Sequence, residues 1–164
     1  MKKTAAWMIL TFCFTAQMFA QRSGDEKAAL DVANKMFTEM ANHDPAAIAA
    51  LYVPGSQLAA VFKNKEGKSV TRFFTGEAFS KNFAEKKSEI KEDMYAPEVK
   101  IYGDLALVFG RYVFFVDNKI SHCGVNAFHM VRTDSGWKVA NASSTMEPQG
   151  CTDKEKAMKA GAAK

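Results

Sequence analysis

The stretch GVNAFHMVRTDSGWKVANAS, residues 124–143, has the pattern of a β-hairpin. Two runs rich in β-branched and aromatic residues flank TDSG, where Gly136 can supply a left-handed turn residue. With residues 134–136 as the loop, Thr133 lies opposite Trp137 and His129 lies opposite Asn141. The sequence therefore predicts that two long antiparallel strands close the folded part of the chain.

Further strands are predicted upstream of this hairpin. The apolar segment LALVFGRYVFFV, residues 105–116, lies between the turn signals YGD and DN. Residues 90–103 alternate with a period of two, and Pro97 confines that segment to a sheet edge or a bulge. A shorter hairpin is expected around the NKEG turn at residues 64–67.

Helices are predicted before these strands. Ser23 and Glu26 form a capping box, followed by an apolar stripe at helical spacing: Ala29, Ala33, Met36, Phe37 and Met40. Asp44 can cap a second helix that has Pro45 in its first turn and ends at Pro54 and Gly55, and capping accounts for Asp44 without a functional role. Thr75 can cap a third helix over residues 76–87.

Helices followed by a meander of long strands predict an α+β fold, with helices packed on one face of a curved antiparallel sheet. Residues 105–116 are apolar at nearly every position, so both faces of that strand require a cover. Helices can cover one face. A second subunit is the simplest cover for the other, so we expect a homodimer.

The first twenty residues have the plan of a secretory signal peptide. MKK is followed by a 13-residue uncharged, mostly apolar run that is too short to span a bilayer, and then by QMFA. We expect cleavage after Ala20 and export to the periplasm or the medium, with no membrane association afterwards. An uncleaved anchor is the alternative. Phe12 before Cys13 disfavours a lipoprotein.

The charge of the mature chain is nearly balanced. Removal of Lys2 and Lys3 with the signal leaves 20 Lys and Arg against 18 Asp and Glu, interleaved along the chain, so nucleic-acid binding is not expected.

The mature chain keeps Cys123 and Cys151, which favours one disulfide in an oxidising compartment. The alternative is one buried thiol and a separate exposed thiol. In the hairpin register Cys123 falls opposite Glu147, which allows Cys151 to reach it.

The order of elements resembles the nuclear transport factor 2-like superfamily, which includes ketosteroid isomerase and SnoaL-like polyketide cyclases. The resemblance covers residues 25–146 and is carried by FTEMANHDPAAIAALY, FFTGEAF, YGDLALVFGRY and the closing hairpin. The chain looks most like small secreted members whose domain has no assigned function. The resemblance implies a cone-shaped sheet around a pocket, and dimers formed through the sheet's outer face.

One face of the hairpin is predicted to line that pocket. The register places an apolar end, with Trp137, Val131 and Val139, next to a polar end, with His129, Asn141, Ser143 and Thr145. Phe128 and Met130 then point the other way. A bulge at Gly124 would reverse the pattern below it.

Candidate chemistry rests on His129 as a general base, with Tyr112 as a donor to an oxyanion if it faces inward. The alternative is that His129 pairs with Asn141 in a polar patch. The carboxylate that the isomerase pattern requires in the strand after the second helix is absent from LAAVFKNKEG before Glu66, which argues against that chemistry. His122 and His129 are seven residues apart and point to opposite faces, so no metal site and no cofactor are expected.

The chain is therefore divided into a signal segment (1–20), one domain (21–148) and a Lys/Ala-rich tail (149–164), which lacks a core-facing pattern and is expected to be flexible. We expect an exported homodimer that binds a small apolar molecule near Trp137, His129 and Asn141. The alternatives are a cyclase, isomerase or dehydratase that uses His129, and a structural dimerisation module whose pocket is filled by its own aromatic side chains.

Overall fold

Six strands and four helices make up the part of the chain that the computed structural model describes, residues 5–160, with side chains from residue 24 onward. In chain order the elements are α1 (Ala5–Asn42), α2 (Pro45–Ala49), β1 (Tyr52–Lys63), β2 (Ser69–Thr75), α3 (Gly76–Lys81), β3 (Ile90–Tyr102), β4 (Leu105–Val116), β5 (Lys119–Thr133), β6 (Gly136–Met146) and α4 (Asp153–Lys156). The predicted α+β class is confirmed.

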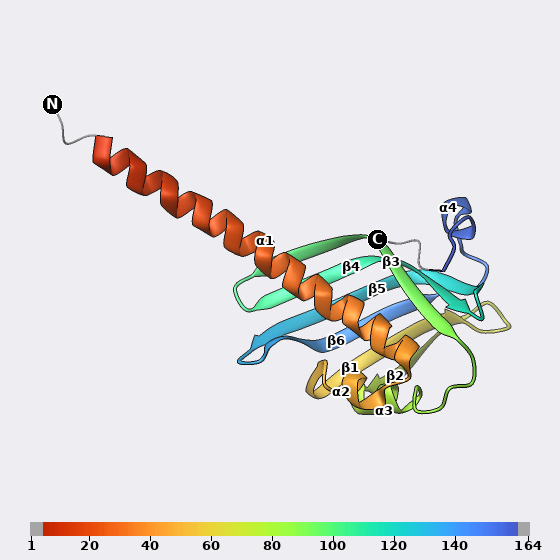
Figure 1. Cartoon of the computed structure of the whole chain (residues 1–164). Coiled ribbons are helices and arrows are strands. Elements are labelled where there is room, and N and C mark those ends of the chain that lie inside the picture. The colour runs from red at the N-terminus through yellow and green to blue at the C-terminus, as the bar shows by residue number, and fades with distance from the viewer. Residues whose placement is uncertain (1–4, 161–164) are drawn as a thin grey trace.

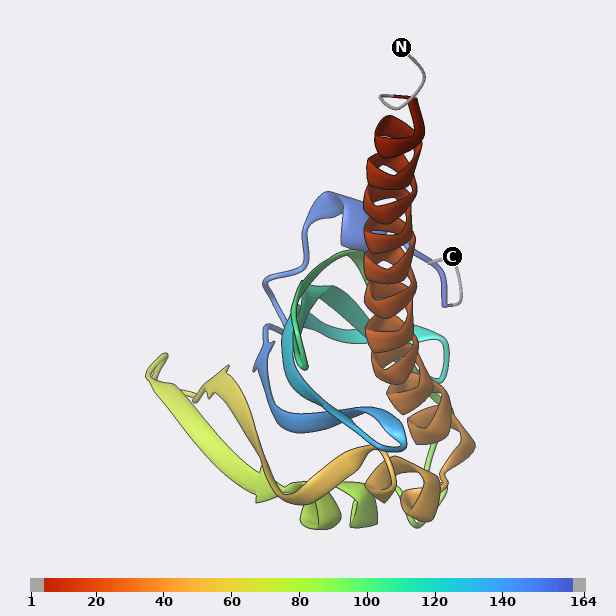
Figure 2. The ribbon, with the colours of Figure 1, turned by 90° about the vertical axis from the view of Figure 1, so that its left-hand side faces the viewer.

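The strands form one curved sheet in the order β2-β1-β6-β5-β4-β3. All neighbours are antiparallel except β1 and β6, which pair in parallel, so the sheet is mixed rather than purely antiparallel as expected. α1 lies across one face, here called the inner face, and the sheet curls toward it (Figures 1 and 2). The opposite face is called the outer face. The predicted cone around the N-terminal helices is confirmed.

Two of the predicted helix caps are present. Asp44 accepts a hydrogen bond from the Ala47 amide at 2.9 Å, and Thr75 accepts one from the Ala78 amide at 3.1 Å. These side chains satisfy amides that the first helical turn leaves without backbone partners.

Three predicted helix boundaries are wrong. α1 runs without a break through Ser23, so the sequence there does not begin a helix. α2 ends at Ala49, and Pro54 and Gly55 belong to β1, where Gly55 has φ of +80°. α3 ends at Lys81 rather than continuing to residue 87.

The β5–β6 hairpin has the predicted register along one half. His129 pairs with Asn141 and Ala127 pairs with Ser143, as expected. Nearer the turn, however, Thr133 pairs with Gly136, so the loop contains two residues instead of three. The difference is absorbed by an irregularity at Ala140, between the His129 and Met130 pairs. One extra residue reverses the facing of a strand. Odd-numbered side chains therefore face inward in one half of β6, and even-numbered side chains face inward in the other half.

The main core lies between α1 and the inner face. The predicted α1 stripe is buried, with Ala29 and Ala33 at 0% exposure and Met36 at 1%. Phe37 contacts Phe128 of β5 with ring centroids 6.0 Å apart. Apolar burial of this kind contributes roughly 25 cal/mol per Å² removed from water, so this stripe holds the helix on the sheet.

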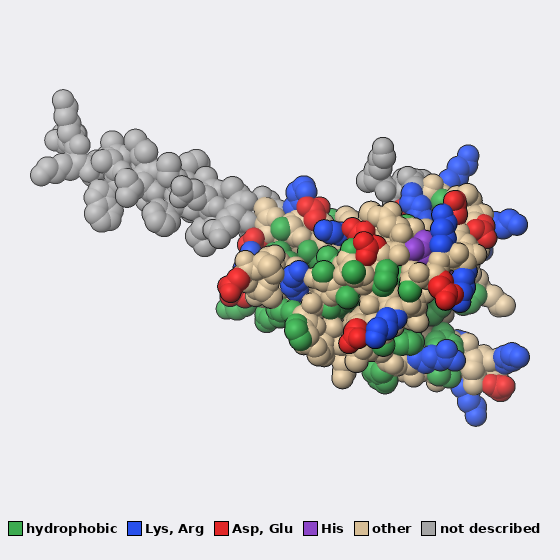
Figure 3. All heavy atoms as spheres, turned by 60° about the horizontal axis from the view of Figure 1, so that its bottom comes forward, with side chains coloured by type: hydrophobic (Ala, Val, Ile, Leu, Met, Phe, Trp, Pro, Cys, Tyr) green, Lys and Arg blue, Asp and Glu red, His purple; other side chains and the backbone are tan. Residues whose placement is uncertain are grey.

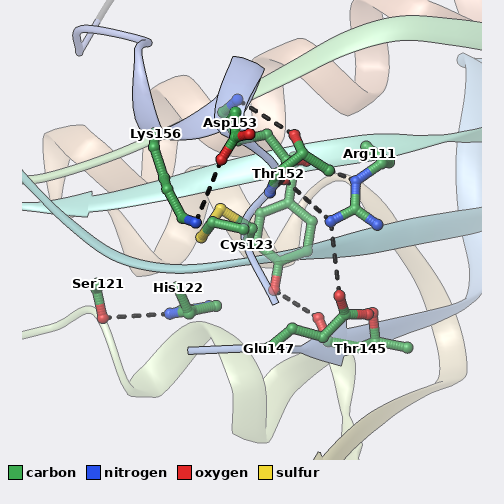
Figure 4. Close-up of a disulfide and its surroundings, with 12 residues drawn as sticks. Arg111, Ser121, His122, Cys123, Thr145, Glu147, Thr152, Asp153 and Lys156 are labelled. Atoms are coloured by element: carbon green, nitrogen blue, oxygen red, sulfur yellow. Dashed lines mark hydrogen bonds and ion pairs between the residues drawn. A yellow bond between two sulfur atoms is a disulfide. The ribbon is translucent and has the colours of Figure 1, made fainter. Parts of the chain in front are cut away.

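The C-terminal tail packs against the outer face, contrary to expectation. Cys123 and Cys151 form a disulfide, and α4 follows directly after it (Figure 4). Glu155 of α4 is fully buried and accepts hydrogen bonds from Arg111 and Tyr95. The tail therefore covers Val113 and Cys123 at one end of the outer face.

The other end of the outer face carries apolar side chains that remain accessible. Leu105, Leu107 and Phe109 alternate along β4 and are each about half exposed, at 49%, 51% and 51%. On the face shown in Figure 3, acidic and basic side chains are interspersed with apolar ones rather than gathered by sign. Among the described residues, no helix combines the length and the apolar character of a membrane span.

Candidate functional site

A cavity of about 250 Å³ lies between the inner face, α1 and α3. Its lining is mostly apolar and includes Met36 and Met40 of α1, Phe79 of α3, Phe83 just after that helix, and Phe128 of β5. Phe79 and Phe83 are one helical turn apart by sequence, and their rings meet edge to face at 5.1 Å. An apolar concavity with a few polar groups has the composition of a small-molecule site.

Three polar side chains of the lining, Glu92, Asn126 and His122, are here called the polar cluster; Asn82, Ser143 and Ser144 also border the cavity. Asn126 donates a hydrogen bond from Nδ2 to Oε1 of Glu92 at 2.5 Å. Burial raises the pKa of Glu92 to about 7; the hydrogen bond from Asn126 opposes this shift and the neighbouring charge of Asp93 adds to it. Glu92 therefore exchanges a proton near neutral pH, unlike an exposed glutamate.

His122 belongs to the polar cluster because β5 directs it to the inner face. It stacks on Phe114 with centroids 4.9 Å apart and meets Tyr112 edge-on at 5.7 Å. Its Nδ1 lies 3.2 Å from the Ser121 hydroxyl (Figure 4). Burial lowers the pKa of His122, so the imidazole is neutral at pH 7.

Two tyrosines complete the cavity, and both have committed their hydroxyl protons. Tyr112 donates to the Thr145 carbonyl at 2.8 Å, and Tyr52 donates to the sulfur of Met36 at 3.2 Å. Burial raises the pKa of both phenols, and the nearby charge of Glu92 raises it further. Within the cavity their oxygens can therefore act as acceptors.

A second hollow lies between α1 and β3. It is lined by polar residues such as Asn34 and Thr38 of α1 and by residues 91–97 of β3. Glu92 and Phe37 border both this hollow and the cavity. The carboxyl group of Glu92 is thus placed between the apolar interior and a more polar groove.

The predicted site residues are not brought together. Trp137 and Val139 are buried, at 4% and 0% exposure, but they pack in the core and do not line the cavity. His129 and Asn141 lie on the outer face, where His129 pairs with Leu107 of β4. The irregularity at Ala140 separates these residues, because the prediction assumed that every second side chain along the whole of β6 faces the same side.

Two of the predicted residues do border the cavity. Tyr112 is at 3% exposure and faces inward, and Ser143 lies along the β6 wall. The prediction that His122 and His129 point to opposite faces is confirmed, but the inward histidine is His122. A general-base role for His129 in this cavity is therefore wrong.

Sequence reasoning missed Glu92, Asn126 and His122. A signal for Glu92 was present, since it alternates with Ile90 and Met94 on one side of an extended segment. A carboxylate between two apolar residues of the same strand face indicates a buried acid. As expected, β1 supplies no carboxylate; the cavity takes its acid from β3 instead.

One group of potential metal ligands occurs among the described residues. The sulfurs of Cys123 and Cys151 and a carboxylate oxygen of Glu155 lie within 4.8 Å of one another. The sulfurs are bonded to each other, and Glu155 is held by Arg111, so these atoms are occupied by structural roles. The predicted disulfide, rather than two separate thiols, is what the structure contains.

Comparison with known proteins identifies the fold. No family model and no curated protein matches the sequence. Solved structures do match: an NTF2-like protein with a cystatin-like fold from Novosphingobium aromaticivorans has 13% identity and a TM-score of 0.64, covering 87% of this chain and 94% of its own. A nuclear transport factor 2-like superfamily protein from Salmonella enterica has 14% identity and a TM-score of 0.62, covering 80% and 97%.

A third match points the same way. A protein of unknown function with a cystatin-like fold from Nostoc punctiforme has 9% identity and a TM-score of 0.59, covering 73% of this chain and 89% of its own. At such identities the likeness concerns the fold, and this fold hosts many functions.

Proposed function

Because the chain has the nuclear transport factor 2-like, cystatin-like fold, with a cavity between its helices and its sheet, we propose that it binds a small, mostly apolar molecule there. The observation that carries the proposal is the combination of an apolar lining with the polar cluster of Glu92, Asn126 and His122. An apolar cavity of about 150 Å³ is known to hold benzene. A cavity of about 250 Å³ accommodates a single ring with a short polar substituent.

Native mass spectrometry of the protein from its own host, purified without detergent, tests this proposal. A defined extra mass supports it. Ala142→Phe fills the cavity from β6, whereas Ala78→Phe adds the same bulk at an exposed position of α3 outside the lining. The extra mass should disappear with Ala142→Phe and persist with Ala78→Phe. A bare protein that also takes up no member of a broad apolar library contradicts the proposal and favours a plugged structural module.

Acid–base catalysis is a second candidate function, favoured by the pKa of about 7 at Glu92 inside an apolar cavity. A base with that pKa can remove a proton next to a carbonyl group, and the polar groove on its other side gives it access to solvent. The test follows deuterium uptake from D₂O into cyclohexanone by proton NMR. Enhanced exchange that Glu92→Gln abolishes supports catalysis; equal exchange in both proteins contradicts it.

We also propose that two copies associate through the exposed part of the outer face. Support comes from Leu105, Leu107 and Phe109, which form an apolar row that the C-terminal tail leaves uncovered. Such a row at half exposure is a feature of protein interfaces rather than of an ordinary strand surface. Two copies related by a twofold axis would bury it.

Export of the chain is a further proposal. It is supported by the signal-like pattern of residues 1–20 and by the disulfide between Cys123 and Cys151, which suits an oxidising compartment. N-terminal sequencing of the protein recovered from the periplasm or the medium should begin at Gln21. Recovery of the intact N-terminus in the membrane fraction would indicate an uncleaved anchor.

A further inference from the structure

The interior of the cavity restricts the chemical class of its ligand. We propose that the cavity takes a small hydrophobic amine, bound as its ammonium ion, with the charge against Glu92 and the hydrocarbon part against the aromatic lining. This inference rests on the proposed binding function and goes beyond it, because binding of an apolar molecule does not by itself require a charge. Three properties of the cavity carry it: charge, hydrogen-bond capacity and aromatic content.

The charge of the lining has one sign. Glu92 is the single formally charged side chain that lines the cavity among the residues the structure describes, and the lining includes neither Lys nor Arg. His122, the remaining basic group, is held neutral by its burial. An anionic ligand would therefore lie near a carboxylate with no cation to offset it, which is costly in an apolar interior.

Several hydrogen-bonding groups of the cavity are available as acceptors, although Asn82, Ser143 and Ser144 of the lining also carry donors. The hydroxyl protons of Tyr52 and Tyr112 are committed to Met36 and to the Thr145 carbonyl. Asn126 gives a donor to Glu92, which leaves its own carbonyl oxygen as an acceptor. An ammonium group supplies three donors and no acceptor, so it can satisfy Glu92 and these acceptor oxygens, to which a carbonyl or an ether cannot donate.

Aromatic rings surround the remaining space. Phe79 belongs to α3 and Phe83 to the turn after it, and Phe114 and Phe128 belong to β4 and β5. The faces of such rings attract cations through their quadrupole, most strongly where water is excluded. One carboxylate within an aromatic enclosure is the arrangement by which proteins hold alkylammonium groups, with the hydrophobic part of the ligand packed on the same rings.

The proposal predicts a specific dependence on pH. Glu92 is faced by Tyr52 from β1, Tyr112 from β4 and His122 from β5, and its neighbours on β3 are Lys91 and Asp93; α1 contributes Phe37 and Met40 and no titratable group. Ammonium binding requires ionised Glu92, whose pKa is about 7. Affinity should therefore rise about 30-fold between pH 5.5 and pH 8, with release of about one proton per ligand at pH 6.

Calorimetric titration of the full chain with three probes of one shape tests the proposal: 2-phenylethylamine, 2-phenylethanol and phenylacetate. We expect the amine to bind tightest at pH 8, the alcohol more weakly and with little dependence on pH, and the carboxylate weakest. Glu92→Gln should reduce amine affinity at pH 8 at least tenfold and abolish its pH dependence. Glu98→Gln, an exposed glutamate on the same strand outside the lining, should change neither.

The possible outcomes separate this inference from the proposed function. If the alcohol binds, Ala142→Phe blocks it, and the amine binds no tighter at pH 8, then the cavity binds ligands but the amine inference is wrong. If no probe binds at any pH, the amine inference is wrong, whereas the proposed binding function is contradicted only if the protein also carries no extra mass and takes up no member of the apolar library. A pH-independent amine affinity in the unmodified protein contradicts the inference without recourse to any variant.

Discussion

Asn126 donates a hydrogen bond to Glu92 at 2.5 Å, although β4 lies between their strands in the sheet. In a flat sheet two strands so separated are about 10 Å apart. The curvature of the sheet closes this gap. The sheet curls toward α1 (Figure 2), and this brings the inner-face side chains of β3 and β5 toward one another. The bond therefore depends on the curvature that also encloses the cavity.

Glu92 should make the folded protein less stable as the pH rises from about 4.5 to about 7. Its folded pKa of about 7 lies above the ordinary value of 4.5, so in this window the folded state binds more protons than the unfolded state. The contribution is fully present below the unfolded pKa and is lost by pH 7, and it amounts to about 3 kcal/mol. Glu92→Gln should therefore unfold at higher denaturant concentration than the unmodified protein at pH 7.5, and at a similar concentration at pH 4.5.

Guanidinium unfolding of both proteins at the two pH values checks this prediction. The difference in midpoint between the two proteins reports on Glu92, because both proteins contain His122. The lowered pKa of His122 acts in the opposite direction, since it removes stability as the pH falls below 6.5. An equal midpoint for the two proteins at pH 7.5 would show that burial of the Glu92 carboxyl group does not destabilise the folded protein.

Glu155 should contribute to stability through its charge. Burial opposes its ionisation, but hydrogen bonds from Arg111, Tyr95 and Thr152 outweigh that effect and lower its pKa to about 2. Glu155→Gln weakens these bonds and should cost about 1–3 kcal/mol at pH 7, with a smaller deficit at pH 2. Asp153→Asn on the same helix, at an exposed position, is the control and should leave the unfolding free energy nearly unchanged.

The disulfide should stabilise the domain without shaping the cavity. It closes a segment of 28 residues, for which restriction of the unfolded chain predicts about 3–4 kcal/mol. Cys151→Ser should lower the unfolding free energy by about that amount, as measured by guanidinium unfolding in the absence of reductant. Cys151 does not line the cavity, so probe affinity at 10 °C should remain. Loss of probe binding by a folded Cys151→Ser protein would show that the tail supports the site.

Leu107→Glu should convert a dimer into a monomer. The side chain is at the centre of the exposed row on β4, and a charge there would be buried without a partner, at a cost of about 2 kcal/mol or more in association. Light scattering after gel filtration gives the mass. Phe73→Glu, at a 72% exposed position on the edge strand β2, is the matched control. A monomeric unmodified protein, or a dimer that survives Leu107→Glu, argues against this interface.

Local signals in the sequence determined the elements of this fold. Asp44 and Thr75 cap helices, the α1 stripe from Ala29 to Met40 is buried, and the apolar alternation of residues 105–116 gives a strand with two apolar faces. The approach of Cys123 to Glu147 also followed from hairpin register. These features depend on residues that are near in the chain or directly paired, so period and turn chemistry are sufficient to find them.

The tertiary structure alone decided which side chains meet. A single extra residue at Ala140 placed Trp137 and Val139 in the core and His129 and Asn141 on the outer face, and no sequence pattern announces such a bulge. Glu92 lies on a different strand from Asn126 and His122, far from them in the chain. The curvature of the sheet brings these residues to one cavity. Strand facing has a period of two, so one inserted residue reverses it, and the sequence leaves that choice to the packing of α1 and the closure of the sheet.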